Sequence, residues 1–381
     1  MKYTNYLYPS ACAEVAAFSP LGEVGEYHLM IHATNPLQTY KQQLDSVLTA
    51  YAILLGAELK GAVAVFKRFF ISDSANQWDE LQSVMADSSD CACSIVEQSP
   101  LDGTKVALWV YLQADVQTRT LHNGLYEVRH GAYRHLWQGG AFNRAANSEY
   151  QMRLLFNEYI MQLMEQQCTL AGNCVRTWIF VRDVDLNYAG VVKARNEVFA
   201  TQNLTEHTHY IASTGIGGRY VDPKVLVTFD AYAVEGVSPE QVKYLYARTH
   251  LNPTSEYGVA FERGTVVEYG DRSHIFISGT ASINNRGEIV CPGDIRQQTE
   301  RMWENVEALL KEADSCFEDM GQMIVYLRDI ADYAVVKQLF DERFPHIPKV
   351  IAQASVCRSG WLIEMECMGI RQNRNQAYAN F

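Results

Sequence analysis

Apolar residues recur at strand-like and helix-like intervals along the last third of the chain. RSHIFISGTASI (Arg272–Ile283) predicts a strand, and DIRQQTERMWENVEALLKEA (Asp294–Ala313) has apolar residues three and four positions apart, which predicts a helix capped by its first aspartate. Further along, the pattern predicts a strand at Gly321–Ile330, a second helix at Asp332–Phe344 and, in PKVIAQASVCRSGWLIEMECMGI, two last strands around Ser359-Gly360.

The same order of elements occurs twice more. In the middle of the chain it gives a strand (Tyr133–Phe142), a helix (Tyr150–Gln167), a strand (Cys174–Val184), a helix (Asn187–Phe199) and closing strands (Tyr210–Val234). The first part of the chain is ordered alike but less clearly. Each copy carries the same kind of strand ending, FFISD, IFVRD or VYLRD. The chain therefore consists of three repeats, which we place at residues 1–120 (repeat 1), 121–250 (repeat 2) and 251–381 (repeat 3).

These repeats predict an α+β fold. Each repeat supplies a β-sheet with two helices on one face, and its other face is apolar enough to need a partner. Three such faces in one chain pack against each other, so we expect an intrachain pseudo-trimer with a cleft between each pair of neighbours. A fused chain lets the three clefts diverge, whereas a symmetric homotrimer does not. We expect a monomer built on this core, and the sequence leaves a higher oligomer open.

Composition and charge narrow the partners. The net charge is -12, which repels phosphate backbones, so nucleic acid is not an expected partner. No signal peptide and no run of about 18 apolar residues is recognised, so we predict a cytoplasmic protein that does not bind membranes. The nine cysteines are scattered, and Cys91 and Cys93 lack a second pair or a nearby histidine to complete a zinc site. The sequence predicts reduced thiols, no metal and no cofactor.

Two acids interrupt the apolar pattern of the last predicted strand. Glu364 and Glu366 lie two residues apart, so their side chains point to one face. In a cleft, Glu364 would be a general acid, since a carboxyl that is partly desolvated and faces a like charge keeps its proton more readily. The alternative is a solvated strand face. The corresponding strand of repeat 1 has no acid and that of repeat 2 has only Asp230, so the fold does not require the pair.

Repeat 3 resembles the RidA (YjgF-type) superfamily. The matching stretches are ISGTAS, TERMWENVEALLKEA, VYLRDIADYAVVKQLFDERFP and the terminal EME, and the resemblance extends over Phe261–Ile370. It implies a chorismate-mutase-like fold and ligand clefts at the interfaces of a trimer. Members are often labelled endoribonucleases, but the acidic charge and the lack of an aromatic and basic strip do not favour RNA binding here.

The span Arg176–Ile370 also resembles the fused chorismatases of the FkbO type. The stretches in common are RTWIFVRD, ASTGIGG, NPTSEYGVAFERG, ISGTAS and VCRSGWLIEME. The resemblance implies hydrolysis of chorismate with loss of pyruvate, and Glu364 as the catalytic acid. It also implies that Gly270 and Cys357 take the places of a small residue and a cysteine near that acid.

A substrate with carboxylates needs cations, and the planar guanidinium group binds carboxylates through two hydrogen bonds. The candidates are Arg263 in FERG, Arg176 in RTWIF and Arg219 after TGIGG, each of which is alternatively a surface charge. STGIGG (Ser213–Gly218) leads into more strand and not into a helix, so its glycines indicate a bend or a close backbone approach, which also leaves open a place in the site wall. Ser278, at a strand end, contacts either the ligand or the turn.

Cys357 as a nucleophile would need an activating group, and in a strand its neighbour Arg358 would point to the opposite face, so a small residue in the cleft wall is the preferred interpretation. His135 and His274 hold equivalent positions in two repeats, which favours a structural role over a metal site.

Three hypotheses follow. The first is a chorismatase-like hydrolase acting on a small cyclic carboxylate. The second is a RidA-like imine deaminase, but such enzymes hold the substrate carboxylate with an arginine where this chain has Lys349 and Val350. The third is a non-catalytic protein that binds small carboxylate metabolites on the same scaffold.

Overall fold

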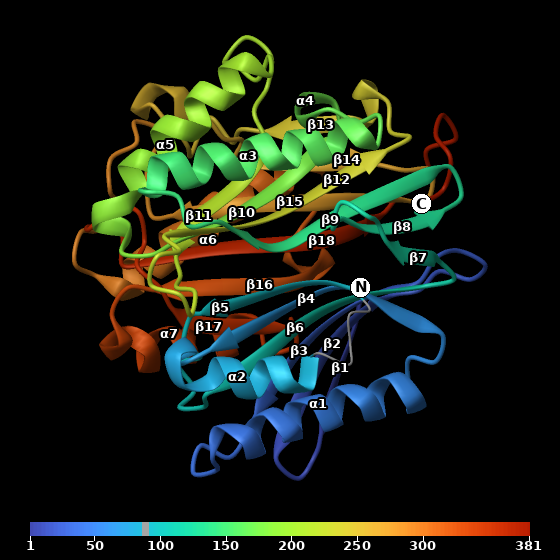
Figure 1. Cartoon of the computed structure of the whole chain (residues 1–381), viewed down its shortest axis with the longest axis vertical. Helices are drawn as coiled ribbons and strands as arrows, with labels where there is room; N and C mark the ends of the chain where they lie inside the picture. Colours follow the sequence, from blue (N-terminus) through green and yellow to red (C-terminus); the bar gives the residue numbers. More distant parts are fainter. Residues whose placement is uncertain (86–90) are drawn as a thin grey trace.

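The computed structural model describes residues 1–85 and 91–381, apart from the side chain of Tyr257, and contains three six-stranded sheets (Figure 1). We now use the names repeat 1, repeat 2 and repeat 3 for these sheets with their helices, so that β7 (Gln117–Thr120) counts with repeat 2 and β13 (Val242–Leu245) with repeat 3, although the bounds placed from the sequence put them in repeats 1 and 2. The sheet of repeat 1 has the order β1-β2-β3-β6-β4-β5. Its elements are β1 (Lys2–Leu7), β2 (Ala11–Phe18), β3 (Glu26–Ala33), α1 (Tyr40–Ala57), β4 (Ala62–Ile71), α2 (Ser74–Met85), β5 (Ala92–Glu97) and β6 (Val106–Ala114).

The other two sheets have the orders β11-β10-β12-β9-β8-β7 and β13-β14-β15-β18-β16-β17. Repeat 2 contains β7 (Gln117–Thr120), β8 (Tyr126–His130), β9 (Tyr133–Phe142), α3 (Ser148–Glu165), α4 (Leu170–Asn173), β10 (Cys174–Val181), α5 (Val184–Thr201), β11 (Ala212–Gly217) and β12 (Val227–Glu235). Repeat 3 contains β13 (Val242–Leu245), β14 (Gly264–Glu268), β15 (Arg272–Ala281), α6 (Ile295–Glu312), β16 (Met320–Leu327), α7 (Tyr333–Arg343), β17 (Lys349–Gln353) and β18 (Ile363–Gln372). Short 3-10 helices lie at η1 (Pro239–Gln241), η2 (Thr254–Tyr257), η3 (Phe317–Asp319) and η4 (Ile330–Asp332).

Local sequence explains the long helices. The predicted helix Asp294–Ala313 is α6, and the Asp294 side chain accepts a hydrogen bond from the backbone N–H of Gln297, as an N-cap does. Asn147 caps α3 in the same way, and Thr39 and Gln42 form a capping box at α1. The predicted α+β fold of three repeats is confirmed. Among the described residues, no helix is both long enough and apolar enough to cross a lipid bilayer.

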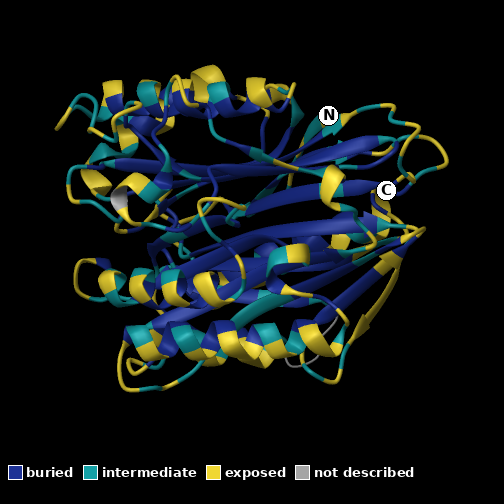
Figure 2. Cartoon of the chain, turned by 90° about the horizontal axis from the view of Figure 1, so that it is seen from above, coloured by how far each residue is buried: buried dark blue, intermediate teal, exposed yellow. Residues whose placement is uncertain are grey.

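The three sheets turn one face toward each other and the other toward their helices, so buried strands occupy the middle of the molecule and exposed helix faces its surface (Figure 2). Trp109, Trp137 and Trp178, one from each of β6, β9 and β10, are almost fully buried there. The ring centroid of Phe66 lies 5.4, 5.4 and 6.1 Å from theirs. This shared aromatic centre holds repeats 1 and 2 together, and apolar residues of repeat 3 complete the same cluster.

The end of the chain differs from the prediction in one respect that matters for the site. Between β17 and β18, residues 354–362 form a connection with a turn, in which the backbone N–H of Trp361 donates to Arg358 O at 3.0 Å. Cys357 and Arg358 therefore do not belong to a strand, and the argument that they face opposite sides of one is wrong.

Candidate active site

A cavity of about 400 Å³ lies between repeats 2 and 3. Repeat 2 contributes α5 and β11 to its wall, and repeat 3 contributes the segment around β14, the end of β15, the connection before β18 and the start of β18. The apolar lining consists of Ala189, Val192, Val259, Phe261, Ala281, Ile283 and Trp361, with Gly215 and Gly279. The polar lining consists of Tyr188, Lys193, Arg195, Ser213, Arg263, Cys357, Arg358 and Glu364.

Glu364 is the single acid among the described residues of this lining. It pairs with Ala281 of β15 on one side and Tyr326 of β16 on the other, and its side chain is 4% exposed. Its carboxyl makes no hydrogen bond within the described structure. Burial, with a smaller contribution from the charge of Glu366, raises its pKa to about 8, although Arg263 and Arg176 act against this shift. A carboxyl with this pKa is mostly protonated at pH 7 and is able to donate a proton.

Gly279 makes room for that carboxyl. A Cβ atom at this position would lie 2.0 Å from Glu364 Oε1, so any other residue would displace the acid. The backbone N–H of Gly279 donates to Thr214 Oγ1 at 2.9 Å, which joins β15 of repeat 3 to β11 of repeat 2 at the edge of the cavity.

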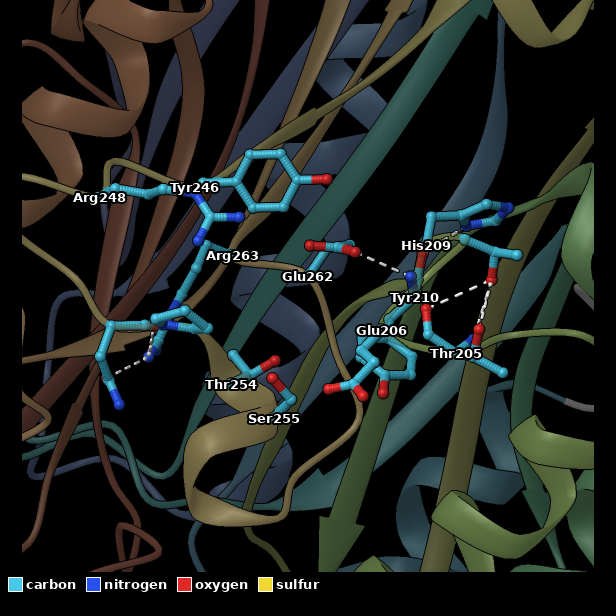
Figure 3. A pocket seen from close by; sticks show the side chains of 13 residues that line it. Thr205, Glu206, His209, Tyr210, Tyr246, Arg248, Thr254, Ser255, Glu262 and Arg263 are labelled. Carbon is cyan, nitrogen blue, oxygen red and sulfur yellow. Dashed lines mark hydrogen bonds between the residues drawn. The ribbon is translucent and has the colours of Figure 1, made fainter.

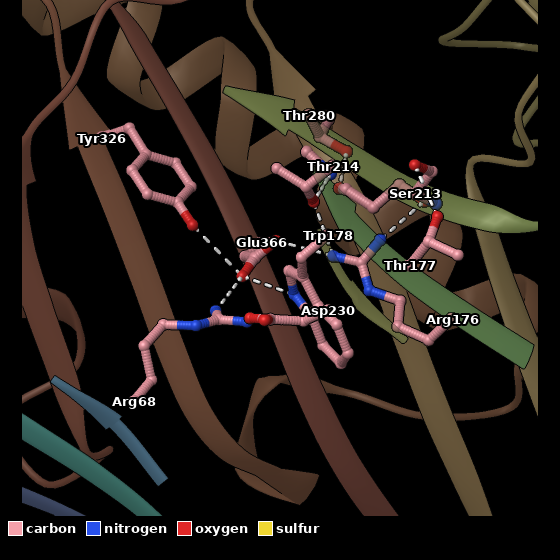
Figure 4. A network of polar contacts seen from close by, with 12 residues as sticks. Arg68, Arg176, Thr177, Trp178, Ser213, Thr214, Asp230, Thr280, Tyr326 and Glu366 are labelled. Atoms are coloured by element: carbon pink, nitrogen blue, oxygen red, sulfur yellow. Dashed lines mark hydrogen bonds and ion pairs between the residues drawn. The ribbon is translucent and has the colours of Figure 1, made fainter. Parts of the chain in front are cut away.

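Glu366 does not line the cavity but lies at the centre where residues of the three repeats meet, which we call the axis, and its carboxylate is surrounded by hydrogen-bond donors (Figure 4). Its carboxylate accepts hydrogen bonds from Arg176 at 2.6 Å, from the Trp178 indole at 2.9 Å and from the Tyr326 hydroxyl at 3.2 Å. Arg68 Nη1 lies 3.6 Å from the same carboxylate. The two acids that the sequence places on one strand face thus differ in their surroundings, since Glu366 is neutralised by partners, whereas no described residue forms a hydrogen bond or an ion pair with Glu364.

Charge is balanced at the axis by residues of all three repeats. Arg68 of repeat 1 also binds Asp230 of repeat 2 at 2.8 Å, so two arginines face two acids, and all four side chains are buried. Equal numbers of buried positive and negative charges are needed because an unpaired charge in the interior strongly destabilises the fold. Arg176 was a candidate for ligand binding, but its guanidinium also donates to Thr214 and is committed to this network.

Arg263, a candidate for carboxylate binding in the sequence, lines the cavity. Its Nη2 donates to the backbone oxygen and the side-chain oxygen of Asn252, at 3.1 and 3.2 Å. It also borders a second, smaller polar pocket of about 90 Å³ (Figure 3). There the Glu262 carboxylate accepts a hydrogen bond from Tyr210 N at 2.8 Å, and burial raises the pKa of Glu262 to about 7. Arg263 therefore lies between the cavity and the smaller pocket and lines both of them.

Cys357 lies in the cavity wall, where its thiol donates to Gly215 O at 2.8 Å. Burial raises its pKa, with a further contribution from Glu364, so the thiol stays protonated. This agrees with a wall residue and not with a nucleophile.

The remaining predicted residues lie outside the cavity lining. Ser278 donates to Glu262 O and accepts from Ser213 N, so it joins the two repeats. Gly270 lies before β15, at the end remote from Gly279, and its N–H donates to Ala379 O. Arg219 is half exposed and forms an ion pair with Asp183 at 3.0 Å. The structure brings together Glu364, Arg263 and Cys357 and separates Ser278, Gly270, Arg219 and Arg176 from them.

Several residues of the cavity lining were not predicted from the sequence, and Arg195 is the most deeply buried cation among them. Arg195 of α5 is 1% exposed and lines the cavity. A signal existed: NYAGVVKARNEVF and DYAVVKQLFDERF align without a gap and place Arg195 at the position of Phe340, a core residue of α7. A charge at an apolar helical position indicates a special environment.

The equivalent histidines occupy the interior. His274 Nε2 lies 2.9 Å from Glu26 Oε1, and His135 contacts the Tyr232 hydroxyl at 2.7 Å. Within the described part of the chain, no group of three or more histidine, cysteine, aspartate or glutamate side chains is arranged to hold a metal ion.

The sequence of repeat 3 is similar to those of known proteins. A family model described as Endoribonuclease L-PSP matches residues 264–370. A RutC family protein of Pyrococcus abyssi (strain GE5 / Orsay) is 36% identical over 101 residues, which are 26% of this chain and 79% of that protein. The chain belongs to the RidA (YjgF-type) family. The family match lies in repeat 3, which carries Glu364, and confirms the resemblance drawn from its motifs.

Two further similarities widen the picture. The 3-aminoacrylate deaminase RutC of Acinetobacter baylyi (strain ATCC 33305 / BD413 / ADP1) is 30% identical over 71 residues, which are 19% of this chain and 56% of that protein. The crystal structure of a chorismatase aligns with a TM-score of 0.63 at 17% identity and covers 81% of this chain and 93% of that protein. At this identity the alignment shows a common fold. Both similar proteins are enzymes by name, so the RidA family and this fused fold accommodate catalysis.

Proposed function

We propose that this protein is a chorismatase-like hydrolase that cleaves the enol ether of chorismate, or of a similar cyclic carboxylate, and releases pyruvate. The observation that carries the proposal is the position of the Glu364 carboxyl, which is buried in the wall of a cavity with apolar sides and makes no hydrogen bond with the described residues. This burial raises its pKa to about 8, which favours the protonated form at neutral pH. The fold shared with a chorismatase supports the same reaction class.

Glu364 would act as the general acid. Its proton is transferred to the terminal CH2 carbon of the enolpyruvyl group, which becomes CH3 and leaves an oxocarbenium ion at the ether carbon. Water adds to that carbon and loses a proton to the Glu364 carboxylate. In the resulting hemiketal, the bond between the former ether carbon and the ring oxygen breaks. The proton of the hemiketal hydroxyl passes to the ring oxygen, so the products are pyruvate and a ring hydroxyl. A protein acid contributes about 10²–10⁴-fold to such a step.

Assay of pyruvate after incubation with chorismate tests the proposal. We expect release by the wild-type protein and a loss of at least about a hundredfold in Glu364→Gln, because the amide has no proton to give. Thr228→Val, at the equivalent strand position of repeat 2, is the matched control and should keep its activity. Because the acid form is active, kcat should fall as the pH rises above about 8. If the wild type releases no more pyruvate than Glu364→Gln, the hydrolase proposal fails.

The deaminase alternative predicts a different product. Lys349, at the position of the expected arginine, is buried, and its Nζ donates to Phe344 O at 3.0 Å. It is not a member of the cavity lining, so we expect no ammonia from iminopyruvate. Ammonia release would favour the deaminase, and saturable carboxylate binding without either product would favour a binding protein.

A further inference from the structure

Arg195 is a buried cation without a counter-ion in the described structure. Its side chain is 1% exposed, and neither its Nε nor its Nη2 has a hydrogen-bond partner there. Among the described residues, no acid forms an ion pair with Arg195 either. A guanidinium keeps its charge under all ordinary conditions, and leaving it unpaired in the interior is strongly unfavourable. The unpaired Arg195 guanidinium therefore lowers the stability of the fold, and we expect its partner to be a bound ligand.

The fold does not need a charge at this position. In repeat 3 the corresponding helix residue is Phe340, which packs against Trp303 with ring centroids 5.1 Å apart. Arg195 instead borders the cavity, and its guanidinium carbon lies 6.0 Å from the Phe261 ring centroid. Arg263 lies 5.2 Å from the same centroid, so two guanidinium groups, one from each repeat, flank one aromatic ring.

The charges of the described lining residues point to an anion. Four side chains of the lining are cationic, Lys193, Arg195, Arg263 and Arg358, against the single acid Glu364. Lys193 is paired with Glu149 at 3.0 Å, outside the cavity. The apolar walls, with Phe261 and Trp361, suit a ring, and the cavity volume of about 400 Å³ lies in the range typical of small-molecule sites.

We propose that Arg195 binds the carboxylate of a single-ring ligand and thereby makes the site selective for cyclic carboxylic acids over their neutral analogues. This inference rests on the proposed function in that it assigns a carboxylate anchor to the same cavity. It commits repeat 2 to holding the ligand and repeat 3 to supplying the acid. Arg195 takes the place that the sequence analysis gave to Arg176.

Calorimetric titration of the full chain with benzoate, and with neutral benzamide, tests this anchor. We expect benzoate to bind one site per chain. Arg195→Met should weaken benzoate binding by about ten- to a hundredfold, which is the usual range for a hydrogen bond to a charged group, and Arg195→Lys should weaken it less. Benzamide should bind both proteins equally. Arg219→Met, which removes an arginine outside the cavity lining, is the matched control and should bind benzoate normally.

Thermal unfolding separates binding from structure. Because Arg195→Met removes an unpaired buried charge, its Tm without ligand should equal or exceed that of the wild type. The proposal is overturned if Arg195→Met binds benzoate as the wild type does, if the wild type binds no benzoate, or if the variant loses Tm or fails to fold. Pyruvate release is measured separately, so Arg195-dependent benzoate binding without turnover would reject the hydrolase and retain the anchor.

Discussion

The cleft between repeats 2 and 3 holds a cavity, whereas the corresponding cleft between repeats 1 and 2 holds aromatic side chains in contact. There the ring centroids of Trp78 and Tyr220 lie 4.6 Å apart and those of Phe142 and Tyr220 lie 4.5 Å apart. The backbones also approach closely, since a Cβ atom on Gly139 would lie 2.6 Å from Cys93 N. The same architecture thus gives an open space in one place and a packed interface in another.

A single pair of facing strand positions accounts for much of this difference. Phe142 faces Thr228 in repeat 2, and Ala281 faces Glu364 in repeat 3. The packed cleft has a large residue on one strand and a small one on its partner, and the open cleft reverses the sizes. Ala281 leaves space, and Glu364 supplies a functional group at the edge of that space.

The third cleft, between repeats 3 and 1, contains polar side chains at the corresponding place. At the same pair of positions His32 faces Ala107. The imidazole of His32 contacts Lys349 O at 3.1 Å and lies 3.6 Å from the Asp102 carboxylate, so this cleft is held by polar contacts. Divergence of the three clefts is what a fused chain permits.

Filling the open cleft should have the largest effect. Ala281→Phe introduces the residue that repeat 2 has at this position, Phe142, and its ring fills the cavity. We expect pyruvate release to fall by at least about a hundredfold, because the substrate can no longer lie beside the acid. Benzoate binding should disappear in calorimetry. Ala281→Ser, which keeps the space, is the control. Normal turnover in Ala281→Phe would mean that the ligand binds elsewhere.

Breaking the axis should cost stability more than any change in the clefts. Glu366→Gln leaves Arg68 and Arg176 with one acid fewer, so we expect the free energy of unfolding to drop by about 3–5 kcal/mol in urea denaturation.

Glu364→Gln provides the contrast. The pKa of Glu364 is raised, so the folded state keeps a proton that the unfolded chain releases, and wild-type stability should decline as the pH rises from about 4.5 to about 8. The Gln variant should lack this decline. Equal losses in the two variants would contradict the assignment of separate roles.

Opening the packed cleft should have a smaller effect. Phe142→Ala removes a half-buried ring that contacts Tyr220 and lies under the Arg144 guanidinium. We expect a loss of about 2 kcal/mol in the free energy of unfolding, less than the 3–5 typical of a fully buried Phe. Pyruvate release should stay unchanged, because this space has no counterpart of Glu364. A drop in turnover would show that the clefts are coupled.

The smallest effect should come from the polar cleft. Burial lowers the pKa of His32, but the nearby carboxylates of Asp102 and Glu14 outweigh this, so the net shift is upward. The charged form therefore stabilises the fold at low pH, and this contribution is lost as the pH rises through the folded pKa. His32→Gln should lower stability by under about 1 kcal/mol at pH 5.5 and by less at pH 9. A pH-independent difference would refute this.

Much of the fold could be predicted from sequence because its signals are local. The apolar spacing of α3, α5, α6 and α7 and the buried runs of β10 and β16 lie within single segments. Edge strands could not be recognised in this way, since β7 (Gln117–Thr120) is short and wholly exposed and so shows no alternation.

The site could be predicted only where repeat comparison isolates a residue. Glu364 stood out because the corresponding strands of the other repeats lack it. Arg176 looked equally suited to a ligand, because its true partner, Glu366, is 190 positions away and on a different repeat. Within its own segment Arg195 looked like one more helix charge, and only its alignment with Phe340 of repeat 3 sets it apart.

Arg68 gives repeat 1 a part in a site that it never touches. All residues of the cavity lining fall between 188 and 364, yet Arg68 neutralises Asp230 and Glu366 beneath that site. Without it, Arg176 would face two acids alone, and the field that reaches Glu364 would become more negative. We therefore expect that a fragment with only repeats 2 and 3 would not form a functional site. The smallest part of the chain that contains everything this site depends on includes all three repeats.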